Sequence, residues 1–172
     1  MKKRLVVVLA LVLAFTSVFF TACGDNKGDT TTAINVGSGG TTGTYYGFCN
    51  VVATVINEKT DMKLTVQSSG ASKANIQSIQ LGEANMAVVQ NDVMYYAYTG
   101  TDLFAGAQTQ DFAALAVLYP ELCQIIATKE SGITTVADLK GKNVSVGDAG
   151  SGVEFNARQI LEIYGIDIEK YN

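Results

Sequence analysis

The 172-residue sequence has no histidine, no tryptophan and one proline, and only 16% of its residues are charged. The absence of histidine excludes HExxH metalloenzymes, Ser-His-Asp triads and histidine-rich metal sites. The sequence also lacks a GxxxxGK[ST] phosphate loop, a GxSxG nucleophile elbow and a CxxC pair. A formal net charge of -4 disfavours a nucleic-acid partner, because such partners are bound largely by neutralising phosphates. We therefore predict no catalytic residue, no metal ligand, no cofactor and no nucleic-acid partner.

The amino terminus has the pattern of an export signal. Basic residues at positions 2–4 precede an apolar run over residues 5–20, and small residues then lead to Cys23. This pattern resembles a bacterial lipobox, in which the cysteine is acylated and becomes the first residue of the mature protein. We expect a lipoprotein signal peptide at residues 1–22, a flexible tether at residues 23–32, and anchoring by lipid on Cys23 to the outer face of the bacterial cytoplasmic membrane. A plain signal anchor is the alternative.

Two further cysteines, Cys49 and Cys123, each lie within an apolar segment. An exported protein meets an oxidising setting, so a disulfide between them is one alternative. We favour two buried free thiols, because cysteine outside disulfides is among the most buried residue types.

Hydrophobic residues make up 48% of the sequence, which rules out a disordered chain, and short β-type runs alternate with helical patterns. Strands are predicted at residues 33–38, 62–66, 86–89, 112–118, 122–128 and 143–146, and helices at 45–57, 72–81 and 151–164. The first helix is expected to bury Phe48, Val51, Val52 and Val55 on one face. Capping patterns start a turn at Thr135-x-x-Asp138 and the last helix at Ser151-x-x-Glu154, and Gly165 is placed to end that helix. This alternation indicates right-handed βαβ units, a mainly parallel sheet and the α/β class.

Three loops rich in glycine, serine and threonine each leave a predicted strand and enter a predicted helix. Loop one covers residues 37–46, loop two residues 67–72 and loop three residues 147–152. In open α/β sheets, ligands bind beyond the carboxyl ends of the strands. Backbone N–H groups, hydroxyls and helix amino ends can hold a carboxylate or another anion without an arginine. A single loop of this kind is more often only a turn with a helix cap.

Four stretches of the chain, in this order, resemble the TAXI family of solute receptors that serve TRAP transporters. They are GGTTGTYYG at residues 39–47, SSGASKANIQSIQLGEANMAVVQND at 68–92, ALAVLYPE at 114–121 and SGITTVADLKGKNVSVGDAGSGVE at 131–154. The resemblance implies an α/β, periplasmic-binding-protein-like fold of type II, in which two lobes with mainly parallel sheets close on a ligand. Residues 33–118 would form ligand-binding lobe one. Residues 119–172 would begin a second lobe that stays incomplete, since receptors of this family are longer than this chain.

The resemblance also implies a ligand site, carried over residue by residue. Its members are Gly40, Thr41, Thr42, Thr44, Tyr45, Ser69, Ser72, Asn75, Gln90, Tyr119, Gly150, Ser151 and Gly152. Hydroxyls, amides and backbone N–H groups would bind carboxylate oxygens, and the tyrosines would enclose the carbon skeleton. The implied ligand is a small carboxylate such as glutamate.

We therefore expect a lipid-anchored extracytoplasmic solute-binding receptor that delivers a small organic anion to a TRAP-type membrane permease. The expected function is binding, not catalysis. One alternative is a ligand-sensing binding protein that signals to a membrane partner. A less favoured alternative is an enzyme on the same scaffold, which the missing histidine base disfavours.

Overall fold

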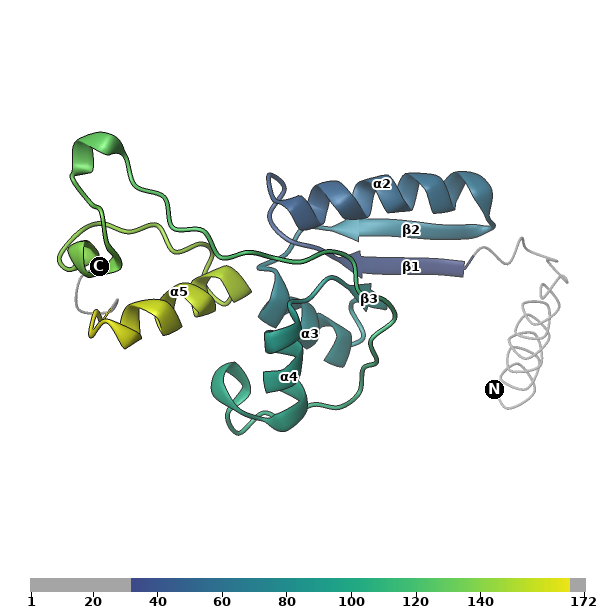
Figure 1. Ribbon diagram of the computed structural model, residues 1–172. Coiled ribbons are helices and arrows are strands. Elements are labelled where there is room, and N and C mark those ends of the chain that lie inside the picture. Colours follow the sequence, from purple (N-terminus) through teal and green to yellow (C-terminus); the bar gives the residue numbers. More distant parts are fainter. Residues whose placement is uncertain (1–31, 168–172) are drawn as a thin grey trace, which may run out of the picture. The chain divides into compact units, whose positions relative to one another are not determined.

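The computed structural model describes residues 32–167 of the chain. Their first half contains a three-stranded parallel sheet (Figure 1). The strands are β1 (Thr32–Gly37), β2 (Met62–Gln67) and β3 (Met86–Ala87), in the order β2-β1-β3. The predicted signal peptide, residues 1–22, and the lipidation site Cys23 lie outside the described residues. No helix among the described residues has the length and hydropathy needed to cross a membrane.

Four α-helices and three short 3₁₀ turns complete the described structure. The helices are α2 (Thr44–Lys59), α3 (Ser72–Gln80), α4 (Asn91–Thr99) and α5 (Gly152–Ile163), and the turns are Asp102–Phe104, Lys129–Ser131 and Val136–Leu139. Helix α2 joins the paired strands β1 and β2, and helix α3 joins β2 to β3, which lies on the other side of β1. The predicted α/β class with a parallel sheet is confirmed.

Helices α2 and α3 cover opposite faces of the sheet. Val36 of β1 packs with Cys49 and Ala53 of α2. A methyl group added at the next residue, Gly37, would lie 2.8 Å from Oδ1 of Asn75 on α3. Successive strand residues point to opposite faces, so the two contacts define two layers around the sheet. Because the strands are parallel, their carboxyl ends meet at one edge, where helices α2, α3 and α4 begin.

The buried apolar residues form three clusters. The first cluster joins α2 to the sheet and contains Val36, Cys49, Ala53 and Leu64. The second joins α3, α4 and the turn after α4 and contains Ile76, Val93, Ala97 and Phe104. The third lies at α5 and contains Leu139, Leu161 and Ile166. Burying a large aliphatic or aromatic side chain stabilises the folded state by roughly 1.5–3 kcal/mol. Helix α2 is therefore fixed by the first cluster, α3 and α4 by the second and α5 by the third.

Three predicted strands are not strands in the structure. Residues 107–128 have neither helix nor strand, and residues 143–146 are irregular as well. A strand needs a neighbour to accept and donate its backbone hydrogen bonds, and these segments pair with no strand among residues 32–167. The strand-like composition of residues 107–128 leaves large apolar side chains exposed, with Val117 at 96% and Ile126 at 90%.

Helix α2 buries a different face from the predicted one. Phe48, Val51 and Val55 are exposed, and the helix packs on the sheet through Cys49, Ala53 and Ile56. Both sets have helical spacing, so periodicity alone does not separate them. The small side chains at positions 49 and 53 allow the helix to approach the strands closely.

Both described cysteines are free. Cys49 is buried, as expected, and its burial raises the pKa of the thiol. Cys123 is exposed because residues 107–128 are not packed as a strand, so the prediction of a second buried thiol was wrong.

Two predicted capping signals are confirmed. The Asp138 carboxylate accepts hydrogen bonds from the N–H groups of Thr135 at 2.8 Å and Thr134 at 3.0 Å, and these bonds lower its pKa. Gly165 follows α5 with φ of +66°, the left-handed conformation in which glycine ends a helix without strain. Helix α4 is not among the helices predicted from the sequence.

Candidate functional site

Loops one and two are held side by side at the carboxyl edge of the sheet. Ser38 donates to the carbonyl of Gln67 from its N–H at 3.1 Å and from its hydroxyl at 2.6 Å. The N–H of Ser69 donates to the carbonyl of Gly39 at 3.2 Å. These bonds continue the pairing of β1 and β2 beyond the strands, so the two loops have a fixed spacing.

Asn75 connects both loops and the end of β3. Its Nδ2 donates to the carbonyls of Ser38 and Val88, each at 2.7 Å, and its Oδ1 accepts from the Ser69 hydroxyl at 2.6 Å. The side chain is fully buried. Both amide hydrogens are therefore used, and we interpret Asn75 as a residue that holds the loops in place for other groups to bind a ligand.

The two predicted serines of loop two also make bonds within the chain. The Ser72 hydroxyl is buried and accepts from the N–H of Gln90 at 3.1 Å, which ties the start of α3 to the start of α4. The Ser69 hydroxyl, besides its bond to Asn75, accepts from the N–H of Ala71 at 3.1 Å. Ser69 is half-buried, whereas Ser72 is buried beneath the edge of the sheet.

Loop three reaches loops one and two. The distance between the loops is shown by the position that a methyl group would take if a glycine were replaced by alanine. At Gly40 this methyl would lie 3.6 Å from Asp148 Oδ2, and at Gly70 it would lie 3.9 Å from the carbonyl oxygen of Ala149. At Gly150 it would lie 3.9 Å from Cδ of Lys73. The structure thus brings together the three loops that were grouped from sequence.

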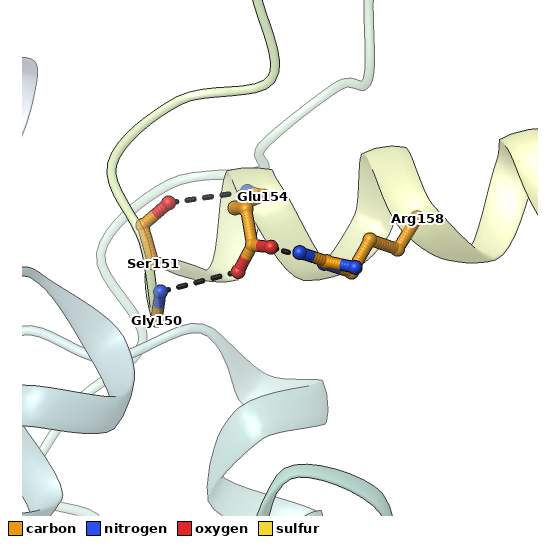
Figure 2. Close-up of polar contacts among 4 residues, drawn as sticks. All are labelled: Gly150, Ser151, Glu154 and Arg158. Carbon is orange, nitrogen blue, oxygen red and sulfur yellow. Dashed lines mark hydrogen bonds and ion pairs between the residues drawn. The ribbon is translucent and has the colours of Figure 1, made fainter. Parts of the chain in front are cut away.

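The start of α5 is capped by its own side chains (Figure 2). The Ser151 hydroxyl accepts from the N–H of Glu154 at 3.1 Å, and the Glu154 carboxylate accepts from the N–H of Gly150 at 3.1 Å. In the predicted capping box the carboxylate would bind the N–H of Ser151, one residue later. The other carboxylate oxygen forms an ion pair with Arg158, whose side chain is partly exposed.

Glu154 stays ionised although it is buried. Burial raises the pKa of its carboxyl, but the hydrogen bonds from Arg158 and from the N–H of Gly150 outweigh burial and leave the pKa below its usual range. The charge of Lys73 acts in the same direction. A negative group therefore already occupies the N–H of Gly150, whereas Gly152 and Val153 lie in the first turn of α5, whose N–H groups have no acceptor within the helix.

The two predicted tyrosines lie near one carboxylate. The Tyr45 hydroxyl donates to Glu121 at 2.8 Å, and burial together with this carboxylate raises the pKa of Tyr45 well above its usual range. Burial and Glu121 also raise the pKa of Tyr119, whose ring meets Phe48 edge-on at 5.9 Å between centroids. The Tyr119 hydroxyl is buried and has no hydrogen-bond partner in the described part of the chain.

The remaining predicted residues differ in availability. Thr41, Thr42 and Thr44 are exposed at the start of α2. The Gln90 side chain crosses to α5 and donates to Asn156 at 2.9 Å. Lys73, in the first turn of α3, was missed by the sequence argument, which expected an anion site without a cation; its place directly after the helix-starting Ser72 was the available signal. Within residues 32–167 no cluster of three acidic, cysteine or histidine side chains is placed to hold a metal ion.

Comparison with known protein families gives one match that covers most of the chain. The NMT1-like family matches residues 36–172, a range that includes the last two residues of β1, strands β2 and β3, all three loops and α5. It is a periplasmic-binding-like family of substrate-binding proteins, and the parallel sheet with its helices is consistent with a partial fold of that kind. Such a protein binds a small molecule. The chain belongs to the NMT1-like family.

Proposed function

We propose that the chain captures a small organic anion, an amino acid such as glutamate, at the meeting point of loops one, two and three. The observation that carries this proposal is the approach of loop three to the other two loops at the carboxyl edge of a parallel sheet. This edge is where ligands bind in open α/β sheets, and the loops lead into helix amino ends that favour negative groups.

The polar groups left for a ligand form a set that suits a carboxylate. The hydroxyls of Thr41, Thr42 and Thr44 are exposed on loop one. The aliphatic part of the Lys73 side chain lies near Gly150 of loop three, and its positive charge acts on Glu154. A charge-assisted hydrogen bond from an ammonium to a carboxylate is about twice as strong as a neutral one. Lys73 therefore supports an anionic ligand, although the predicted site residues include no arginine.

Negative groups at the same loops support a ligand that also carries an ammonium. The Asp148 carboxylate lies against Gly40, and the Glu121 carboxylate holds the Tyr45 hydroxyl. Neither carboxylate forms an ion pair among the described residues. A plain dicarboxylate would be repelled by both, whereas an α-amino acid offers them a positive partner. Glutamate therefore fits better than a dicarboxylate without an amino group.

The buried hydroxyl of Tyr119 adds a second argument for a bound group. A buried polar atom without a partner costs the folded chain roughly 1–3 kcal/mol. Tyr119 lies in the segment that leads from the lobe with the sheet toward loop three. Ligand binding that shifts this segment can supply the missing partner.

Delivery to a TRAP-type permease and anchoring through Cys23 complete the proposal. Their support is the resemblance of four stretches to TAXI receptors and the lipobox-like sequence before Cys23. The protein would bind and release its ligand without chemistry, and the permease would use the ion gradient.

Calorimetric titration of the full chain with glutamate, and separately with glutarate, tests the proposed ligand class. Glutarate has the same carbon skeleton and both carboxylates but lacks the ammonium. We expect saturable binding of glutamate and binding of glutarate at least about tenfold weaker, the factor that corresponds to one good charge-assisted contact. Equal affinities would contradict the role given to Asp148 and Glu121, and no heat from either compound would contradict the ligand class.

A further inference from the structure

Helices α4 and α5 are joined by a polar and aromatic contact that the proposed ligand site does not use. The Gln90 and Asp92 side chains at the start of α4 both bind Asn156 of α5. One helical turn further along, the Tyr96 ring meets Phe155 edge-on at 5.2 Å between centroids. Its hydroxyl accepts from Gln159 at 3.3 Å. Residues 107–128, which have no helix or strand, separate the two helices in sequence. The contact therefore joins residues on either side of this irregular segment.

Asn156 is the centre of the contact. Its Oδ1 accepts from Gln90 Nε2 at 2.9 Å, and its Nδ2 donates to Asp92 Oδ2 at 2.8 Å. The other Asp92 oxygen accepts from the N–H of Val93 at 2.8 Å, which orients that carboxylate. One planar amide thus binds a donor and an acceptor at the start of α4, because it carries both an acceptor oxygen and a donor nitrogen. We call this chain of three side chains the Gln90–Asn156–Asp92 bridge.

The bridge holds Gln90 against the first residue of α5. A methyl group added at Gly152 would lie 1.2 Å from Gln90 Oε1, so the amide occupies the space that any side chain there would need. The backbone N–H of Gln90 donates to the buried Ser72 hydroxyl of α3. Gln90 therefore connects the start of α4 with the starts of α3 and α5, the helices that follow loops two and three.

We propose that the Gln90–Asn156–Asp92 bridge holds loop three over loops one and two, and that Asn156 is a positioning residue that acts through Gln90. Three hydrogen bonds and one edge-on aromatic contact form a connection weak enough to open and specific enough to close in one register. The importance of this tie for ligand capture rests on the proposed function. The tie itself does not, because it joins residues of the chain in the absence of any ligand.

Backbone hydrogen exchange of the full chain without ligand, followed by mass spectrometry, measures how often the tie opens. The peptides of interest contain the first turns of α4 and α5. In Asn156→Asp the amide donor is lost and a second carboxylate faces Asp92, while the shape is kept. We expect exchange in both peptides to become at least about fivefold faster, the factor for one lost hydrogen bond. The matched control is Asn50→Asp, whose amide donates only to the carbonyl of Tyr46 within α2.

The double variant Asp92→Asn/Asn156→Asp restores the pattern with donor and acceptor exchanged. Residue 156 then accepts from both Gln90 and residue 92, and exchange should return to within about twofold of the original rate. Unchanged exchange in Asn156→Asp would overturn the proposal, and so would a double variant as fast as the single one. Equal acceleration by Asn50→Asp would overturn it too, by showing a general effect of added charge. The exchange rates are measured without ligand, so they test the bridge even if the chain does not bind glutamate.

Discussion

Replacing Gly152 by alanine gives a quantitative test of how closely loop three meets α4. The added methyl would lie 1.2 Å from Gln90 Oε1, so the Gln90 amide must leave its place. Leaving breaks the 2.9 Å bond to Asn156, at a cost of about 1 kcal/mol. Alanine in a helix gains at most about 1 kcal/mol over glycine, and the gain is smaller at the first helical position. We therefore expect the free energy of unfolding to stay level or to fall by up to about 1 kcal/mol.

The control for this substitution is Gly47→Ala in α2. A methyl group at Gly47 would have no atom within 4 Å, so only helix propensity changes. Urea unfolding followed by circular dichroism should show Gly47→Ala more stable than the original chain by up to about 1 kcal/mol. The two glycine substitutions should therefore differ by roughly 1–2 kcal/mol.

A double-mutant cycle with Gln90→Ala attributes the difference to its cause. Once the Gln90 amide is absent, Gly152→Ala should become neutral or stabilising, which gives a coupling of about 1 kcal/mol or more. The reasoning fails if Gly152→Ala stabilises as much as Gly47→Ala does. It also fails if the cycle shows no coupling, because Gln90 would then not occupy the space over Gly152.

Three further predictions concern separate features. Asn75→Ala removes three buried hydrogen bonds and should lower the free energy of unfolding, measured with urea, by about 3 kcal/mol. The control Asn50→Ala should lower it by less than about 0.5 kcal/mol. Equal losses would contradict the role of Asn75 in holding the loops. The Glu154 carboxyl has its pKa lowered by folding, so its stabilisation is complete above the usual value of about 4.3 and is lost as pH falls through the folded-state value. Glu154→Gln should therefore flatten the acid side of the Tm-against-pH curve, and an unchanged slope would contradict the ion pair with Arg158. Cys23→Ala should leave the protein unlipidated and released from the membrane fraction on immunoblotting, whereas retention there would favour the plain signal anchor.

Local sequence signals predicted much of the fold. Strands β1 and β2 alternate apolar and polar residues, and both lie where the pattern placed them. Helix α3 begins at Ser72 as predicted, and α5 begins after Ser151 and ends before Gly165. These elements carry their signals within a few residues, so one sequence is enough to find them.

Features set by distant partners were not predictable in this way. Residues 107–128 have strand composition but no strand partner among the described residues, and composition does not report the partner. Helix α2 carries two apolar stripes, and only the packing on β1 and β2 selects the one with Cys49 and Ala53. Helix α4 starts with polar residues whose purpose is the contact with Asn156, which lies more than sixty positions later.

The candidate site shows the same division. Sequence placed the three loops at one edge, and the structure brings them together. Sequence did not show that the Asn75 amide is fully used inside the chain or that Glu154 caps Gly150, because these depend on bonds made in three dimensions. It also left out Lys73, since the expected site relied on backbone groups and hydroxyls alone.

The affinity of Lys73→Met for glutamate, measured by calorimetry on the full chain, tests the central claim most directly. Methionine keeps most of the side-chain volume near Gly150 and removes the charge that acts on Glu154. The control is Lys63→Met, which removes the same charge from an exposed position on β2. The account predicts an affinity lower by about tenfold or more for Lys73→Met and an affinity within about twofold of the original for Lys63→Met. Equal affinities in the two variants would contradict a carboxylate site at the meeting point of the three loops.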